Sequence, residues 1–142
     1  MKITVAGIGM TKFGELWDKS VFDLALDAAK KAIDDSKIDP KKIDAVFVAN
    51  MLASKLDNQD QLGACVTTLL GLSVPAVRIE GACASGGLAI HQGVSAILSG
   101  LYETVMVLGV EKMTDVSACE ITTALMGAGS QEERLSGLTF PG

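Results

Sequence analysis

The sequence predicts an α/β protein with a mostly parallel sheet and helices packed on its faces. Apolar segments of strand length alternate along the chain with segments of helical periodicity, which is the pattern of such folds. The apolar segments run without interruption, as strands do when both faces of a parallel sheet are covered. The 142 residues include 15 glycines and only 4% aromatic side chains, so small residues are expected where helices meet the sheet.

The opening of the chain predicts the first strand and the first helix. Residues 3–8 are an apolar run followed by a glycine-rich loop, and we interpret this run as a buried strand. Ser20 and Asp23 resemble a capping box at the start of a helix, with Asp in place of the more usual Glu. Apolar residues then recur at helical spacing, and Pro40 ends the segment.

The same alternation continues along the chain. The predicted strands are residues 43–49, 75–79 and 103–110, the predicted helices are residues 61–72 and 84–100, and residues 50–59 are expected to form a polar loop. No further helix–strand unit follows, because residues 117–142 contain scattered glycines and predict an irregular tail. We therefore expect an incomplete unit rather than a finished domain.

Composition excludes several classes of function. A net charge of −5 argues against binding the phosphate backbone of nucleic acids, which needs a basic surface. No apolar stretch approaches ~18 residues, so no membrane span is expected, and the first residues lack the zones of a signal peptide. Three cysteines without framework spacing indicate reduced thiols and a cytoplasmic location. His91 is the sole histidine, which argues against a metal site.

The glycine-rich segment 7–14 does not predict nucleotide binding. The dinucleotide fingerprint needs a third glycine where this chain has Lys12, and its helix should begin at once rather than near Ser20. The second strand ends at Asn50 without the acidic residue that binds ribose. We interpret the glycines as loop residues.

Cys83 is the candidate nucleophile. It lies between the strand at 75–79 and the helix from Ala84, so its side chain should face the first helical turn. A helix N-terminus stabilises the thiolate, which is the reactive form of cysteine. Small residues flank Cys83, which leaves space for a bulky thioester and backbone N–H groups able to bind an oxyanion. A small buried cysteine in a glycine-rich turn is the alternative interpretation.

The remaining cysteines and the histidine fit less well with catalysis. Cys65 lies within a predicted helix beside apolar residues and is expected to pack in the core, and Cys119 falls in the irregular tail. His91 follows Cys83 by eight residues, or ~12 Å along a helix, and is too far away to act as its base. The sequence thus offers a nucleophile without an evident base.

Four segments resemble the thiolase superfamily. VPAVRIEGACASGGLAI (74–90) is similar to the nucleophile segment of thiolases, and GVEKMTD (109–115) to the segment after their fourth strand, with Thr114 replacing the usual Ser. QLGACVTTLLGL (61–72) resembles the helix that precedes the nucleophile. The opening VAGIGMTKFG (5–14) looks closest to the sterol-carrier-type and archaeal acetyl-CoA acetyltransferase-like thiolases.

The resemblance implies a thiolase-like layered fold of two similar halves, of which this chain looks like most of the first. Residues 1–116 would form the N-terminal domain, with four strands and the nucleophile helix, and residues 117–142 the truncated start of an inserted loop region. In the family, the second half supplies the activating histidine, a second cysteine and much of the coenzyme A contact. The chain alone is therefore expected to be inactive, and a separate C-terminal half or another acyl-CoA enzyme is an expected partner.

The resemblance also implies a reaction. The Cys83 thiolate would attack an acyl-CoA thioester, a substrate rather than a bound cofactor, and form an acyl-enzyme for Claisen condensation or thiolytic cleavage. The Cys83 backbone N–H would contribute to the oxyanion site. Met113 and Met126 would lie near the acyl chain, unless they serve only for packing. The family forms homo-oligomers, dimers or tetramers, through the region around residues 75–79.

Two other readings remain open. One is a related condensing enzyme of the ketosynthase or hydroxymethylglutaryl-CoA synthase type, which also places a cysteine at a helix start. The other is a non-catalytic scaffold or assembly module, which would need no reactive thiol.

Overall fold

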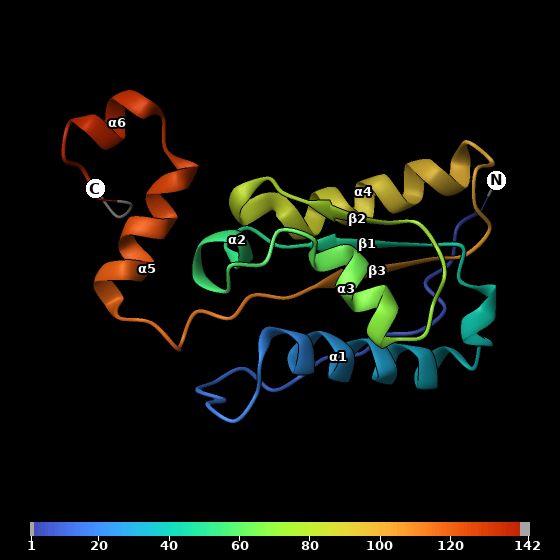
Figure 1. Ribbon diagram of the computed structural model, residues 1–142. Helices are drawn as coiled ribbons and strands as arrows, with labels where there is room; N and C mark the ends of the chain where they lie inside the picture. Colours follow the sequence, from blue (N-terminus) through green and yellow to red (C-terminus); the bar gives the residue numbers. More distant parts are fainter. Residues whose placement is uncertain (1, 140–142) are drawn as a thin grey trace.

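The computed structural model describes residues 2–139 and contains a three-stranded parallel sheet with helices on both faces (Figure 1). The strands are β1 (Ala45–Ala49), β2 (Ala76–Ile79) and β3 (Val105–Gly109), in the order β2-β1-β3. The central strand pairs in parallel with both neighbours, with Val46 opposite Ala76 and Met106. The predicted α/β class is confirmed, and all three strands fall within predicted ranges.

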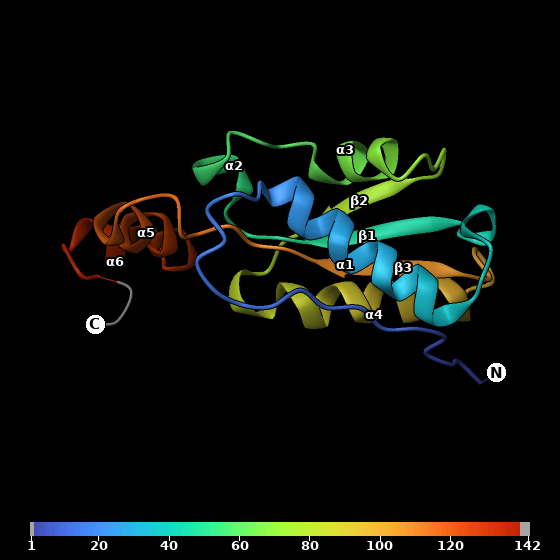
Figure 2. The same cartoon turned by 90° about the horizontal axis from the view of Figure 1, so that it is seen from below.

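Two apolar clusters form the core, one on each face of the sheet. Val46 and Val48 of β1 pack against α1 (Val21–Ser36) and α3 (Leu62–Leu69). Phe47 and its neighbours pack on the opposite face against α4 (Ser85–Leu98). Figure 2 shows α3 and α4 on opposite sides of the strands. Every residue of β1 is buried, as its uninterrupted apolar sequence predicts.

The long helices begin and end where local sequence favours it. The Ser20 hydroxyl accepts a hydrogen bond from the Asp23 N–H at 3.1 Å, and the Asp23 carboxylate accepts one from the Ser20 N–H at 2.8 Å. This reciprocal pair is the predicted capping box. The helix ends at Lys37, which adopts the left-handed conformation. Beyond α3, Gly71 has a φ of +69°, which glycine adopts easily.

Residues 3–8 do not form the predicted strand. This segment is extended, but it lies across α1 and beside α4 instead of pairing with the sheet (Figure 2). It is bonded to the helix through Ile8, whose N–H donates to the Asp35 carboxylate at 2.9 Å. Gly7 lies so close that a Cβ there would sit 2.5 Å from the Ala32 carbonyl oxygen. Contact with the helix backbone thus replaces strand pairing.

The expected loop at residues 50–59 and the expected irregular tail both contain short helices. These are α2 (Ala53–Leu56), α5 (Ala118–Leu125) and α6 (Gln131–Leu135), and the 3-10 turns are Pro40–Lys42, Ala82–Ala84 and Met126–Ala128. The tail prediction was wrong because Ser117 with Glu120, and Ser130 with Glu133, form capping boxes that start α5 and α6. Both helices lie beyond the carboxyl ends of the strands (Figure 1).

Candidate functional site

Cys83 lies in a tight turn between β2 and α4. The strand ends at Ile79, the 3-10 turn Ala82–Ala84 follows, and the helix begins at Ser85. The Cys83 side chain is exposed, so the alternative of a buried packing cysteine does not describe it. In a parallel sheet, ligands approach at the carboxyl ends of the strands, which is where this turn lies.

Hydrogen bonds from two side chains hold this turn. The Ser85 hydroxyl, which is buried, accepts from the Gly81 N–H at 3.0 Å and donates to the Ala82 carbonyl at 2.7 Å. The Glu80 carboxylate accepts from the Ala82 N–H at 2.6 Å. Ala82 itself has a φ of +49°, a left-handed conformation that costs a residue with a Cβ about 1 to 2 kcal/mol.

The turn leaves the backbone N–H of Cys83 outside its hydrogen bonds. The N–H groups of Gly81 and Ala82 donate to side chains, and those of Ala84 and Ser85 donate to backbone carbonyls within the turn. Cys83 therefore presents an exposed sulfur and an N–H group next to the first turn of a 14-residue helix. Chemically, a thiol in this position can act as a nucleophile, and a neighbouring N–H group can donate to developing negative charge.

The other sequence candidates lie elsewhere on the fold. Cys65 is half-buried on α3 and accepts a hydrogen bond from the Gln59 amide at 3.5 Å. Cys119 is exposed at the start of α5, in a helix rather than an irregular tail. His91 is exposed on α4, and within residues 2–139 no hydrogen bond joins it to Cys83.

The two candidate methionines are separated from the turn in sequence and element. Met113 follows β3 and is half-buried, and Met126 is half-buried at the end of α5. The Met126 methyl group lies near Gly129. No hydrogen bond or ring contact in the described part of the chain ties either residue to Cys83, so their predicted place near an acyl chain stays a prediction.

A polar network joins the loops after β1 and β3, and sequence reasoning did not identify it. The Glu111 carboxylate accepts hydrogen bonds from the Asn50 amide at 2.9 Å, the Met51 N–H at 2.9 Å and the Leu52 N–H at 3.1 Å. Arg78 of β2 reaches the same loop, donating to the Met51 carbonyl at 2.9 Å and to Ser54. These bonds fix the loop that follows the central strand.

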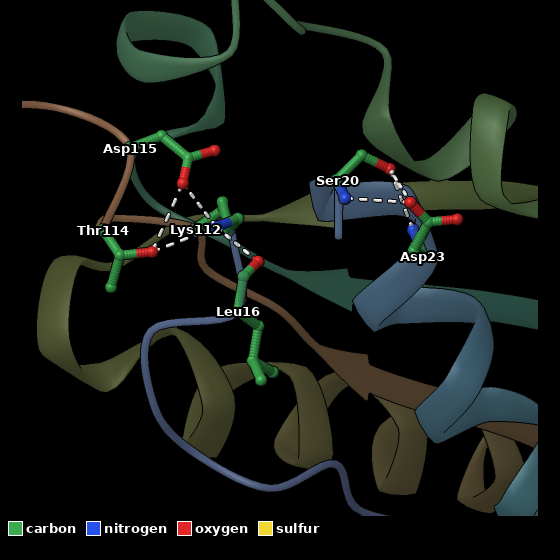
Figure 3. A network of polar contacts seen from close by, with 6 residues as sticks. All are labelled: Leu16, Ser20, Asp23, Lys112, Thr114 and Asp115. Carbon is green, nitrogen blue, oxygen red and sulfur yellow. Dashed lines mark hydrogen bonds and ion pairs between the residues drawn. The ribbon is translucent and has the colours of Figure 1, made fainter. Parts of the chain in front are cut away.

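Lys112 connects this region to the amino-terminal loop. Its ammonium group donates to the Leu16 carbonyl at 3.1 Å, the Thr114 hydroxyl at 3.0 Å and the Asp115 carboxylate at 2.5 Å (Figure 3). Lys112 is only 4% exposed, and its charge lies 5.8 Å from the centre of the Trp17 ring. Few lysines are buried so fully without such partners.

Asp57 contrasts with this satisfied network. One of its carboxylate oxygens is buried and has no hydrogen-bond partner within residues 2–139. Burial raises the pKa of Asp57, and the nearby carboxylates of Glu111 and Asp115 raise it further, while Lys112 lowers it. Asp57 is thus a carboxyl group whose ionised form the fold disfavours.

Two hollows mark the surface. An apolar groove of about 580 Å³ is lined by the amino-terminal segment, α1, α4 and β3, and a hollow of about 480 Å³ lies between α2 and α5 beside Cys119. Among residues 2–139, no three His, Cys, Asp or Glu side chains are grouped to hold a metal ion. None of the helices in that range is long and apolar enough to span a membrane.

The fold and the turn define a class of protein: an α/β chain with a parallel sheet, whose exposed cysteine follows a strand and starts a helix. A family model described as "Thiolase, N-terminal domain" matches residues 3–142. The chain belongs to this family, and the resemblance inferred from its motifs is confirmed.

Individual relatives agree with this assignment. The chain is 42% identical over 141 residues to the acetyl-CoA acetyltransferase of Methanothermobacter thermautotrophicus, a match that covers 98% of this chain and 36% of that protein. It is 31% identical over 117 residues to human sterol carrier protein 2, covering 80% of this chain and 21% of that one. The chain thus spans about a third of the acetyltransferase and a fifth of the carrier protein.

A solved structure supports the fold. The crystal structure of 3-oxoacyl-[acyl-carrier-protein] synthase III from Aquifex aeolicus matches with a TM-score of 0.63 and 26% identity. The match covers 69% of this chain and 32% of the synthase. Because the match covers 69% of this chain, it supports the layered α/β architecture.

Proposed function

We propose that this chain supplies the acyl-accepting cysteine of a thiolase-type acyl-CoA acyltransferase. The observation that carries the proposal is the exposed Cys83 in a held strand–helix turn, in a chain that belongs to the thiolase family. Residues 1–116 would form the N-terminal domain of that enzyme and residues 117–142 the start of a further region. The similarity to an acetyl-CoA acetyltransferase favours a short acyl-CoA as donor.

The chemistry would proceed through a covalent intermediate. The Cys83 thiolate attacks the thioester carbonyl carbon, and the Cys83 N–H donates to the resulting oxyanion. When the tetrahedral intermediate collapses, the carbon–sulfur bond to coenzyme A breaks. Coenzyme A leaves as a thiol after taking up a proton, and the acyl group stays on Cys83. Met113 and Met126 would lie near the acyl chain.

The second step would need groups outside this chain. Condensation requires a base that deprotonates a second acyl-CoA, and within residues 2–139 no hydrogen bond joins His91, the sole histidine, to Cys83. We propose that a further half or another acyl-CoA enzyme provides it, within a homo-oligomer, dimer or tetramer, formed around the edge strand β2. The three free cysteines support a reducing, cytoplasmic compartment.

Intact-mass and peptide mass spectrometry after mixing the chain with acetyl-CoA test this proposal. The full reaction should need the further half, but we propose that the acylation step alone occurs in this chain, so we expect one acetyl increment that maps to Cys83 and is lost in Cys83→Ala. Cys119→Ala is the matched control, because Cys119 is also exposed at the start of a helix. An increment on Cys119, or no increment at all, contradicts the proposal, and the latter result favours a non-catalytic assembly module.

A second candidate is a condensing enzyme of the ketosynthase type. The match to the Aquifex aeolicus synthase, whose name specifies an acyl-carrier-protein substrate, favours it. The same assay with acetyl-acyl-carrier-protein as donor separates the two functions. Faster acylation of Cys83 from the carrier protein than from acetyl-CoA would favour the ketosynthase.

A further inference from the structure

We propose that Glu80 is a positioning residue for Cys83, because its carboxylate holds Ala82 in the left-handed conformation that sets the nucleophile turn. This inference rests on the proposed function of Cys83. It deepens that function by assigning a role to a residue whose carboxylate bonds to the backbone directly before Cys83.

The backbone at Ala82 is the feature that needs explanation. Within residues 2–139, three residues other than glycine have a positive φ: Lys37, Asn58 and Ala82. Lys37 ends α1, where the left-handed conformation is common, and asparagine tolerates it through its short polar side chain. Ala82 neither ends a helix nor has a polar side chain that favours this conformation. Its conformation must therefore be imposed by contacts, and it lies directly before Cys83.

The contacts that hold the Ala82 backbone come from Glu80, which precedes it in the chain, and from Ser85, which follows it. The Glu80 carboxylate accepts the Ala82 N–H at 2.6 Å, and the Ser85 hydroxyl accepts the Gly81 N–H and donates to the Ala82 carbonyl. A hydrogen bond to an ionised acceptor is about twice as strong as one between neutral groups. The peptide unit between Ala82 and Cys83 carries the Cys83 N–H, so the Ala82 backbone also aims that donor.

Glu80 and Ser85 differ in what else depends on them. Ser85 is buried at the start of α4, and its removal would disturb the core. Glu80 is exposed, and the bond to Ala82 is the single hydrogen bond of its side chain within residues 2–139. Loss of the Glu80 carboxylate therefore changes the turn and leaves the rest of the fold intact.

The charge of Glu80 makes the inference testable. A carboxylate near a cysteine disfavours the thiolate, so it would slow the chemistry if charge were its main effect. If its hydrogen bond is the main effect, Glu80→Gln keeps an acceptor and should retain the rate, whereas Glu80→Ala should lose it. Ala82→Gly supplies a residue that adopts positive φ without help.

The experiment measures the acetylation rate of Cys83 by acetyl-CoA and its alkylation rate by iodoacetamide in the full chain. We expect Glu80→Ala to slow both by about five- to tenfold, the factor that 1 to 1.4 kcal/mol of lost conformational bias corresponds to. Glu80→Gln should stay within about twofold of the native chain. Glu80→Ala combined with Ala82→Gly should recover most of the rate. Glu103→Ala, an exposed glutamate at the opposite end of the sheet, is the control.

Each other result overturns the inference. If Glu80→Ala reacts as fast as the native chain, the carboxylate does not hold the turn. If Ala82→Gly fails to restore the rate, Glu80 acts by another route. Should native Cys83 not accept acetyl at all, the proposed function fails, and the alkylation rates alone decide whether Glu80 positions the thiol. Circular dichroism of each variant checks that α4 and the sheet remain folded.

Discussion

The environment of Asp57 disfavours its ionised carboxylate. Its buried oxygen has no hydrogen-bond partner within residues 2–139, and Glu111 and Asp115 are close enough to repel it. Because its pKa is raised on folding, the folded state holds this proton to higher pH than the unfolded chain does. The protonated carboxyl group of Asp57 therefore contributes to the free energy of unfolding at low pH, and this contribution is lost as the pH rises through the pKa of Asp57 in the folded state.

We predict that Asp57→Asn stabilises the protein at pH 7 by up to about 1 kcal/mol, because the neutral amide avoids the burial and repulsion of the carboxylate. The gain should shrink as the pH falls toward 4, where the native carboxyl group is protonated as well. Urea unfolding midpoints at both pH values measure this. Asp60→Asn, at an exposed neighbouring position, should have no such effect. An equal gain at both pH values would contradict the explanation.

The sequence located Cys83 correctly because its position depends on residues that are its neighbours in the chain. Cys83 was found because a strand, a small-residue turn and a helix follow one another within a few positions. The polar network of Glu111 and Lys112 was not predicted because their partners lie far along the chain: Asn50 is 61 residues from Glu111, and Leu16 is 96 residues from Lys112. No spacing rule connects residues so distant.

Among the elements, α1 has the clearest local cause. Ser20 and Asp23 satisfy each other's backbone N–H groups at the helix start, and these hydrogen bonds hold the pKa of Asp23 below its usual range. We predict that Ser20→Ala lowers the unfolding free energy by about 1 kcal/mol, the typical loss for a removed N-cap. Thermal or urea unfolding measures it.

Ser73→Ala is the matched control for this prediction, since Ser73 is exposed and lies outside any helix. A loss of similar size in both variants would mean that the capping box is not the cause. The helical content of Ser20→Ala at low denaturant should stay close to native, because packing of α1 on the sheet retains the helix.

Helices and strands with strong periodicity or an uninterrupted apolar sequence were predicted well. Segments whose conformation depends on contacts with distant parts of the chain were not. β1 is buried on both faces, as its uninterrupted apolar sequence predicted. Residues 3–8 have the composition of a strand, but two glycines permit contact with the backbone of α1, and that contact decides their place. The short helices α5 and α6 were missed despite their capping boxes, because scattered glycines suggested a loop.

For the molecule as a whole, the exposed apolar surface is the main feature. Ile90 and Leu98 of α4 are 58% and 54% exposed, and Leu101 just beyond is 67% exposed. Monomeric soluble proteins rarely leave large contiguous apolar patches uncovered. Exposed apolar side chains of this kind favour association with another surface.

We predict that the isolated chain associates with itself in a concentration-dependent manner, as sedimentation velocity over a hundredfold range of concentration would detect. Ile90→Lys combined with Leu98→Lys should weaken this association at least tenfold, because two charges would have to be desolvated at the contact. Leu135→Lys, at an exposed position on α6, should change it little. A monomer at all concentrations would contradict the prediction.

The bond between Lys112 and Leu16 also sets an order of events during synthesis. The ammonium group of Lys112 is made 96 residues after the Leu16 carbonyl to which it donates. Until then, the Leu16 carbonyl has the Lys19 N–H as a partner but not Lys112, and β1 still lacks its neighbour β3. Contacts between such distant residues slow folding. The contact between the amino-terminal loop and the segment after β3 therefore forms only once the chain has been made as far as Lys112.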